Sequence, residues 1–176
     1  MAPILPRRYQ PELPTHGLLL SEAPSAEALE MDVLFVGAGP AGLAGAIELA
    51  RLAKQDQAAG GTLGEINIGV LEKAGSLGEH CLSGAVINPR ALRELFPDLK
   101  DSDFPFRQPV SSEAVYLLSE GGSLRLPTPP TMQNHGYFTA SLCEVVRWMG
   151  EQAESLGVNI FPGFPAASLL VDGQSV

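Results

Sequence analysis

Apolar residues in the first half of the chain change from a strand-like run to a helix-like spacing and back again. The segments "VLFV" at 33–36 and "INIGVLEK" at 66–73 are mostly apolar, as in parallel strands that are covered on both faces. Between them, residues 40–54 carry apolar side chains at helical spacing, which predicts a helix. Its buried face is expected to hold Leu43, Ile47, Ala50 and the stem of Lys54. The order of strand, helix and strand predicts a βαβ unit in an α/β fold.

The second half of the chain mixes helical and extended patterns. The glycine-rich stretch 75–89 is expected to be an ordered loop, and Pro89 suits the first turn of a short helix. Residues 97–136 are rich in proline, and the alternating segments "AVYLL" and "SLRLP" within them predict a small antiparallel β excursion. Residues 141–156 have helical spacing and stop before Gly157, after which "VNIFPG" predicts a third strand.

Composition narrows the class of protein. The 176 residues are enough for one domain, and we expect a proline-rich arm over 1–30 and a domain over 31–176. The net charge of −9 argues against a nucleic-acid partner, and no apolar run approaches the roughly 20 residues of a membrane-spanning helix. Cys81 and Cys143 are too few to hold an iron–sulfur cluster or a structural zinc ion, and are expected to be reduced in a cytosol-facing compartment.

The junction between the first strand and the first helix has the spacing G-x-G-x-x-G, at Gly37, Gly39 and Gly42. The first glycine permits a tight turn, the second lets the backbone approach a pyrophosphate, and the third lets the helix pack against the sheet. The N-terminus of the helix then presents unpaired N–H groups to the phosphates, and Pro40 removes an N–H that the helix cannot use.

Glu72 at the end of the second strand completes a dinucleotide-binding pattern. Its carboxylate can accept hydrogen bonds from both hydroxyls of an adenosine ribose and would repel a 2′-phosphate. The interval from Gly37 to Glu72 exceeds the usual ~20 residues, because a glycine-rich loop at 55–65 lengthens it. The alternative is a glycine-rich turn and a surface glutamate in an unrelated α/β domain. The glycines do not distinguish FAD from NAD, because both cofactors share the ADP half.

Three further segments, in order along the chain, resemble one family of flavoproteins. They are "LEKAGSLGEHCLSGAVINPRALRELFPD", "NHG" and "RWMGEQAESLGVNIFPGFPAASLL". Together with "VLFVGAGPAGLAGAIELA", they are similar to the electron-transfer flavoprotein–ubiquinone oxidoreductase family from about residue 31 to 172. The geranylgeranyl reductase-like flavoproteins share the first motif but not "LSGA" and "NHG" together, and they remain the alternative.

The resemblance implies the N-terminal portion of a Rossmann-like FAD-binding fold of the glutathione-reductase type. It implies electron transfer from reduced electron-transfer flavoprotein through FAD to ubiquinone, at the cytoplasmic side of a bacterial inner membrane. The family's iron–sulfur cluster belongs to a C-terminal region, so the chain is expected to be truncated, and an inactive fragment is a further alternative. Some relatives have an arginine where this chain has Ser141. The residues expected to bind FAD are Gly37, Gly39, Pro40, Ala41, Gly42, Glu72, Lys73, Leu82, Ser83, Gly84, Ala85, Ala166 and Ala167.

Four other features have a plain structural interpretation beside a chemical one. His80 and Cys81 are adjacent in the loop near the expected flavin, and shaping that loop is favoured over catalysis. His135 lies in a turn-like composition, and Cys143 and Trp148 fall on the apolar face of the later helix. The segment "LRLPTPPTM" at 124–132 is either an ordinary edge hairpin or a surface loop that enters a membrane interface. We expect no catalytic acid or base, because flavin electron transfer does not need one.

Overall fold

The computed structural model describes residues 18–21 and 29–171, and the chain divides into two compact units. The larger unit comprises residues 31–165. The smaller unit comprises the chain up to residue 30 and from residue 166 onward. The two units are described separately below.

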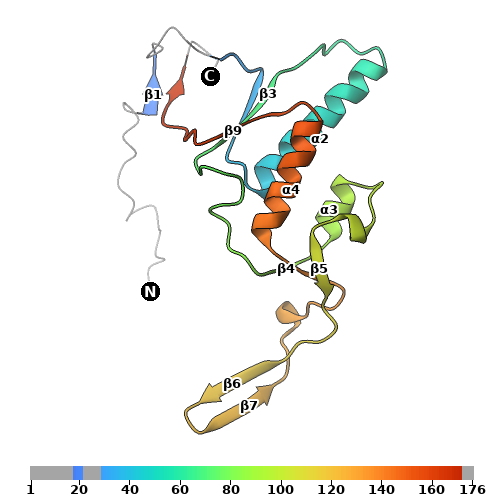
Figure 1. Cartoon of the computed structure of the whole chain (residues 1–176), viewed down its shortest axis with the longest axis vertical. Coiled ribbons are helices and arrows are strands. Elements are labelled where there is room, and N and C mark those ends of the chain that lie inside the picture. The colour runs from blue at the N-terminus through green and yellow to red at the C-terminus, as the bar shows by residue number, and fades with distance from the viewer. Residues whose placement is uncertain (1–17, 22–28, 172–176) are drawn as a thin grey trace, which may run out of the picture. The chain divides into compact units, whose positions relative to one another are not determined.

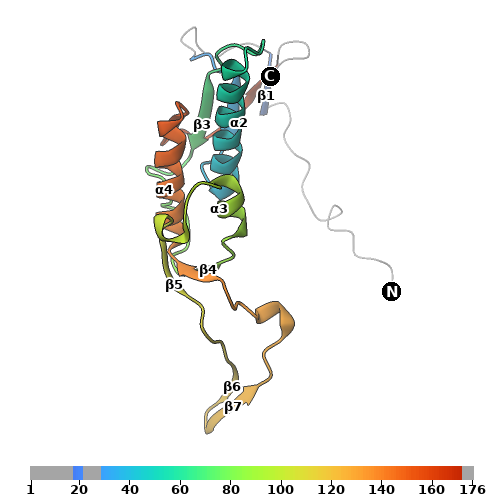
Figure 2. The same ribbon diagram turned by 90° about the vertical axis from the view of Figure 1, so that its right-hand side faces the viewer.

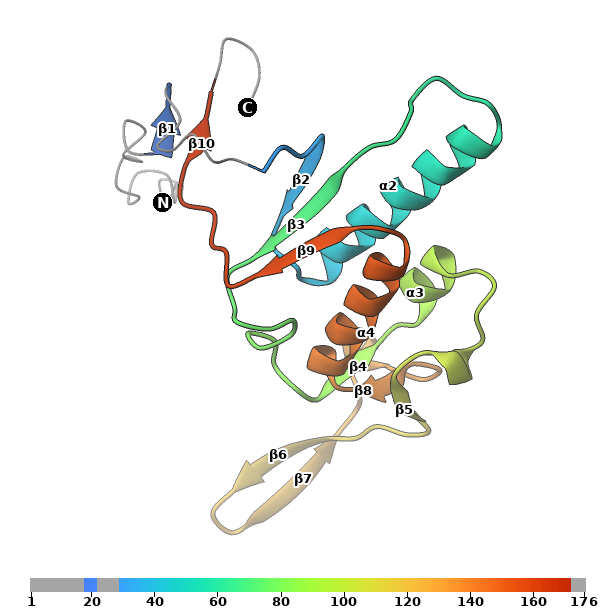
Figure 3. The ribbon, with the colours of Figure 1, turned by 45° about the horizontal axis from the view of Figure 1, so that its top comes forward.

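A parallel three-stranded sheet is the centre of the larger unit (Figure 3). Its strands are β2 (Val33–Val36), β3 (Ile68–Glu72) and β9 (Asn159–Pro162), in the order β2-β3-β9. The register sets Val36 against Leu71 and Glu72 against Pro162, so the carboxyl ends of the strands lie at one edge. The three strands expected from the sequence are therefore confirmed, the first with the expected bounds and the other two with shorter ones.

Two helices pack side by side against this sheet (Figure 1). Helix α2 (Pro40–Ala58) joins β2 to β3, and helix α4 (Leu142–Ser155) precedes β9. Pro40 is the first residue of α2 and Ser141 precedes the first residue of α4, as the sequence predicts. The expectation that Lys54 lies on the buried face is wrong, because its side chain is exposed and the neighbouring Ala53 is buried there instead.

The core lies between the helices and one face of the sheet. Leu43, Ile47, Val70 and Val146 are its largest fully buried side chains. The expectation that β2 is covered on both faces is wrong, because Leu34 and Val36 are exposed. Alternate residues of a strand point to opposite faces, and among the described residues β2 is an edge strand with no layer over the second face.

A smaller antiparallel sheet follows, with the order β4-β8-β5. Its strands are β4 (Ala85–Ile87), β8 (Phe138–Ala140) and β5 (Phe106–Pro109). The interpretation of 75–89 as loop throughout is therefore wrong at its end, where β4 forms. The pairing partner of β4 is about 50 residues away in sequence, so the local glycine content does not reveal it.

Short elements connect β4 to β5 of the smaller sheet. Helix α3 (Arg90–Leu95) follows Pro89, as expected, and a 3₁₀ turn η2 (Asp101–Asp103) follows it. Four aromatic side chains from this region and from α4 pack edge to face or tilted against one another, with ring centroids 4.9–6.3 Å apart. They are Phe96, Phe104, Phe106 and Trp148. This cluster confirms that Trp148 packs in the interior.

The expected antiparallel excursion is a hairpin of β6 (Val115–Ser119) and β7 (Gly122–Leu126), followed by the 3₁₀ turn η3 (Pro130–Met132). Figures 1 and 2 both show the hairpin standing clear of α2 and α4. Its side chains are therefore largely exposed on both faces.

The smaller unit contains one parallel pair, β1 (Leu19–Leu20) with β10 (Leu169–Leu170). Most of the expected arm over 1–30 lies outside the described residues. Within residues 18–21 and 29–171, no helix combines the length and apolar character that crossing a bilayer requires.

Candidate cofactor-binding site

The turn from β2 into α2 needs glycine at two of its three motif positions for reasons internal to the fold. Gly37 has a φ of 101°, a conformation that L side chains rarely adopt. A Cβ at Gly42 would lie 2.0 Å from the carbonyl oxygen of Gly37, so the helix approaches the strand end this closely only without a side chain. Gly39 differs: its φ is −74° and a Cβ there would meet nothing within 4 Å. The absence of a side chain at Gly39 leaves open space in front of the turn.

The same turn presents unpaired backbone donors. The amide of Leu43 bonds to the carbonyl of Gly39, and the amide of Gly37 bonds to that of Leu71. Within the described residues, the N–H groups of Gly39, Ala41 and Gly42 have no recorded partner. Such groups at a helix N-terminus suit a phosphate group.

The carboxylate of Glu72 lies beside this turn. Its Oε2 accepts a hydrogen bond from the backbone N–H of Ala38 at 2.9 Å, and its Oε1 accepts one from the N–H of Ala74 at 2.8 Å. These two bonds fix the side chain between the ends of β2 and β3. A carboxylate offers about four acceptor positions, so capacity remains for two hydroxyl groups.

The loop after Glu72 runs from this carboxylate to the first turn of α4. Gly78 has a φ of 77°, and a Cβ there would lie 2.6 Å from the carbonyl oxygen of Cys143. The Sγ of Cys143 donates to the carbonyl oxygen of Cys81 at 2.9 Å. Burial is the largest cause that raises the pKa of the Cys81 thiol, followed by the charges of Cys143 and Glu72. Cys81 is therefore a packed thiol that stays protonated at neutral pH, and its backbone carbonyl ties the loop to α4. His80 beside it is exposed.

The next part of the loop borders an open cavity of about 630 Å³, whose lining includes charged and hydroxyl side chains. Ser83, Gly84 and Ala85 line one side of it, and Ser141 and Glu144 at the start of α4 line another. Gly84 has a φ of 78°, which fits the glycine found there. Three of the four residues expected near the flavin, 82–85, therefore face one cavity, and Leu82 does not line it.

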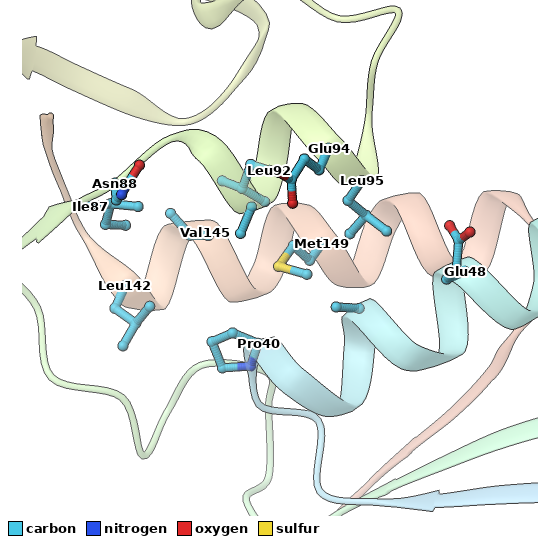
Figure 4. Close-up of a pocket in the computed structure, with 12 residues that line it drawn as sticks. Pro40, Glu48, Ile87, Asn88, Leu92, Glu94, Leu95, Leu142, Val145 and Met149 are labelled. Atoms are coloured by element: carbon cyan, nitrogen blue, oxygen red, sulfur yellow. The ribbon is translucent and has the colours of Figure 1, made fainter. Parts of the chain in front are cut away.

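A second cavity of about 480 Å³ is mostly apolar and lies between α2, α3 and α4 (Figure 4). Pro40 stands at one side of it, next to the glycine turn, while Leu142, Val145 and Met149 come from α4. Leu92 and Leu95 of α3 face them from the opposite side. Leu92, Val145 and Met149 also belong to the buried core, so this cavity lies within the packing between the helices.

The structure brings six of the thirteen expected site residues together at the carboxyl ends of the parallel strands: Gly37, Gly39, Pro40, Ala41, Gly42 and Glu72. Residues 83–85 line the 630 Å³ cavity. Lys73 and Leu82 have exposed side chains, and Ala166 and Ala167 belong to the smaller unit. His135 is exposed, and the described residues contain no cluster of three side chains suited to hold a metal ion.

Sequence reasoning did not identify Ala38, Arg107 and Glu144 as parts of the site. Arg107 and Glu144 are 37 positions apart, and Ala38 contributes only its backbone N–H. No sequence pattern marks such contacts, because they depend on how distant elements meet.

No protein-family model matches the chain. Curated proteins, however, are similar to it over most of its length. The mitochondrial electron transfer flavoprotein-ubiquinone oxidoreductase of Dictyostelium discoideum is 46% identical over 149 residues, covering 85% of this chain and 24% of that protein. The Pseudomonas aeruginosa protein of this name is 46% identical over 154 residues, covering 85% and 27%, and the mitochondrial Bos taurus protein is 45% identical over 145 residues, covering 81% and 22%. The chain thus spans about a quarter of the length of these relatives.

A solved structure shares the fold. It is a geranylgeranyl bacteriochlorophyll reductase-like protein from Thermoplasma acidophilum, with a TM-score of 0.50 and 20% identity, covering 77% of this chain and 30% of that one. This likeness concerns the fold alone and supports the expected Rossmann-like architecture. The identities of 45–46% to the curated relatives, over 81–85% of the chain, are much more specific than this structural likeness. Over the matched residues, the chain is therefore similar to the N-terminal part of proteins named electron transfer flavoprotein-ubiquinone oxidoreductase.

Proposed function

We propose that this chain binds FAD and forms the cofactor-binding portion of an oxidoreductase that passes electrons from reduced electron-transfer flavoprotein to ubiquinone. The proposal rests on two kinds of group that lie side by side. Within the described residues, the backbone N–H groups of Gly39, Ala41 and Gly42 have no recorded partner. They lie beside the carboxylate of Glu72, which two hydrogen bonds hold in place. The names of the relatives supply the donor and the acceptor.

The residues present fit an ADP-containing cofactor. The open space at Gly39 and the free N–H groups suit a pyrophosphate, and the remaining acceptor positions of Glu72 suit the two ribose hydroxyls. The segment of Leu82, Ser83, Gly84 and Ala85 would approach the flavin half. Bound FAD would supply the redox chemistry, and the chain would bind, orient and shield it.

Calorimetric titration with ADP and FAD tests this site. An alanine at Gly39 enters open space, so it leaves the fold intact but occupies the position expected for the pyrophosphate. We expect Gly39→Ala to weaken both ligands by about tenfold, the equivalent of one strong hydrogen bond. Gly121→Ala is the matched control, because a Cβ there also meets nothing within 4 Å.

Two results would contradict the proposal. One is unchanged affinity in Gly39→Ala. The other is a wild-type chain that binds neither ADP nor FAD, which would identify it as a fragment without cofactor binding. The iron–sulfur cluster of the family is assigned to segments outside this chain.

We also propose that the β6–β7 hairpin enters a membrane interface, which places the protein peripherally on a membrane; in a bacterium this is the cytoplasmic side of the inner membrane. Leu117 faces Leu124 across the hairpin, and Val115 faces Leu126, so one face presents two apolar pairs. Leu118, on the opposite face, is 75% exposed. An isolated two-stranded hairpin is marginally stable in water, and burial of these side chains in lipid would stabilise it.

Co-sedimentation with phosphatidylcholine vesicles tests the hairpin. Leu124→Glu together with Leu126→Glu places two charges on the apolar face and should abolish co-sedimentation. Leu63→Glu is the control, because Leu63 is equally exposed but lies outside the hairpin. Binding that persists in the double variant would remove the proposal.

A further inference from the structure

The cavity beside Ser83, Gly84 and Ala85 is lined by one cationic side chain, that of Arg107. Arg107 comes from β5, an element that the glycine turn and Glu72 do not involve. Among the residues that line the cavity, its partner in charge is Glu144 in the first turn of α4. The cavity thus combines a guanidinium, a carboxylate and the hydroxyl groups of Ser83, Thr139 and Ser141.

A bulge in β5 sets the position of this arginine. Phe106 pairs with Ala140 and Pro109 with Phe138, so three steps along β5 face two steps along β8. Bulges of this kind redirect a side chain and are frequent next to binding sites. The bulge is fixed by Thr139, whose Oγ1 donates to the carbonyl of Gln108 at 3.1 Å and accepts from its N–H at 3.2 Å.

An ion pair then fixes the guanidinium itself. Nη2 of Arg107 donates to Oε1 of Glu144 at 2.7 Å. The two side chains are 61% and 45% exposed, and an exposed pair of this kind contributes little to stability. Within the described part of the chain this is the one hydrogen bond recorded for the Arg107 side chain, which has five N–H donors. The pair therefore orients a cation that keeps most of its donors available.

The loop that forms one wall of the cavity is the loop that begins at Glu72. It contacts the first turn of α4 through Gly78 and Cys81 before it reaches Ser83. One continuous segment therefore connects the expected ribose contact with the cavity that holds Arg107. If Ser83, Gly84 and Ala85 face the flavin half of FAD, as proposed above, that half borders the cavity that holds Arg107.

We propose that Arg107 is a flavin-contacting residue, oriented by Glu144, whose guanidinium binds the polar edge and ribityl hydroxyls of the flavin half of FAD. This inference rests on the proposed binding of FAD. The flavin ring presents carbonyl oxygens and the ribityl chain presents hydroxyls, and a guanidinium with free donors matches both. Arg107 would contribute nothing to the ADP half, which the glycine turn and Glu72 serve.

Separate titrations with ADP and FAD test this division. We expect Arg107→Met to weaken FAD by about tenfold or more, the loss of a hydrogen bond from a charged donor, and to leave ADP affinity unchanged. Glu144→Gln should weaken FAD by a smaller factor, since the cation stays but loses its orientation. Arg125→Met is the control, because it removes the same charge from the hairpin.

The outcomes separate the two proposals. If wild type binds neither ligand, the proposed function fails and this inference fails with it. If both ligands bind but Arg107→Met affects neither, or weakens both equally, the flavin contact alone is overturned. Arg107→Lys provides a second measurement that keeps the charge, and it should bind FAD with intermediate affinity. The melting temperature of each variant verifies that it is folded.

Discussion

Gly42 and Gly37 touch across the start of α2, where a Cβ on Gly42 would lie 2.0 Å from the carbonyl oxygen of Gly37. The obstacle is backbone, which cannot rotate away as a flexible side chain can. The third glycine of the motif is therefore required by the fold, whereas the second, Gly39, borders open space. The two positions separate the structural and the ligand-binding contributions of one motif.

This difference predicts opposite results for two alanine substitutions. Gly42→Ala should lower the free energy of unfolding by about 2–3 kcal/mol, because the helix must move away from the strand end. Gly39→Ala should change it by less than about 0.5 kcal/mol. Urea denaturation followed by circular dichroism measures both. Equal destabilisation by the two substitutions would show that the contact at Gly42 does not limit the packing of α2.

Glu72 is predicted to select against a 2′-phosphate. Wild type should prefer 5′-AMP to 2′,5′-ADP, which is 5′-AMP with an added 2′-phosphate that the carboxylate repels, and Glu72→Gln should reduce that preference. The substitution also removes an acceptor from a backbone N–H, so the free energy of unfolding should fall by about 1–3 kcal/mol. Competition titrations measure the first effect. Glu65→Gln, an exposed carboxylate in the preceding loop, is the control. An unchanged preference in Glu72→Gln would show that Glu72 takes no part in recognising the ribose.

Cys81 is predicted to react slowly with iodoacetamide. Burial, and after it the charges of the Cys143 thiol and the Glu72 carboxylate, raise the pKa of Cys81 above the ordinary value of 9.0. Less thiolate is therefore present at any given pH. In a Cys143→Ala variant, where Cys81 is the remaining thiol, the midpoint of the pH–rate profile should still lie above 9.0, since burial is the larger cause. A midpoint below 9.0 would contradict the packing of the loop.

The same raised pKa predicts how stability depends on pH. The folded state keeps the Cys81 proton where the unfolded state has lost it, so the contribution of this group is complete below pH 9.0. It is lost as the pH rises through 9.0 toward the raised folded value. Cys81→Ala should remove this part of the alkaline loss, as measured by unfolding at pH 7 and pH 10.

The aromatic cluster predicts a large local effect. Phe104 is 4% exposed and its ring centroid lies 5.5 Å from that of Trp148. Phe104→Ala should lower the free energy of unfolding by about 3–5 kcal/mol and shift Trp148 emission to longer wavelength as water enters. Phe164→Ala, at a 60% exposed position, is the matched control and should leave both quantities unchanged. Unshifted emission in Phe104→Ala would show that the cluster does not shield Trp148.

Much of the fold could be predicted from local pattern, because the period of apolar residues identifies β2, α2, β3, α4 and β9 directly. The glycine turn was equally visible, since its residues and its function are contiguous in sequence. The strands β4, β5 and β8 were not identified, and β2 was expected to be covered on both faces. The strands of the smaller sheet pair with partners that are distant in sequence. The exposure of β2 depends on which layers cover the parallel sheet.

The sequence by itself determined the βαβ unit, the glycine turn and the carboxylate that follows it, because each depends on steric and periodic properties of neighbouring residues. Only the tertiary structure decided that Glu72 is fixed by Ala38 and that Arg107 meets Glu144 beside Ser83. Those contacts join elements separated by 34 or 37 positions. Their geometry is set by how the sheets and helices pack, a property that no local segment contains.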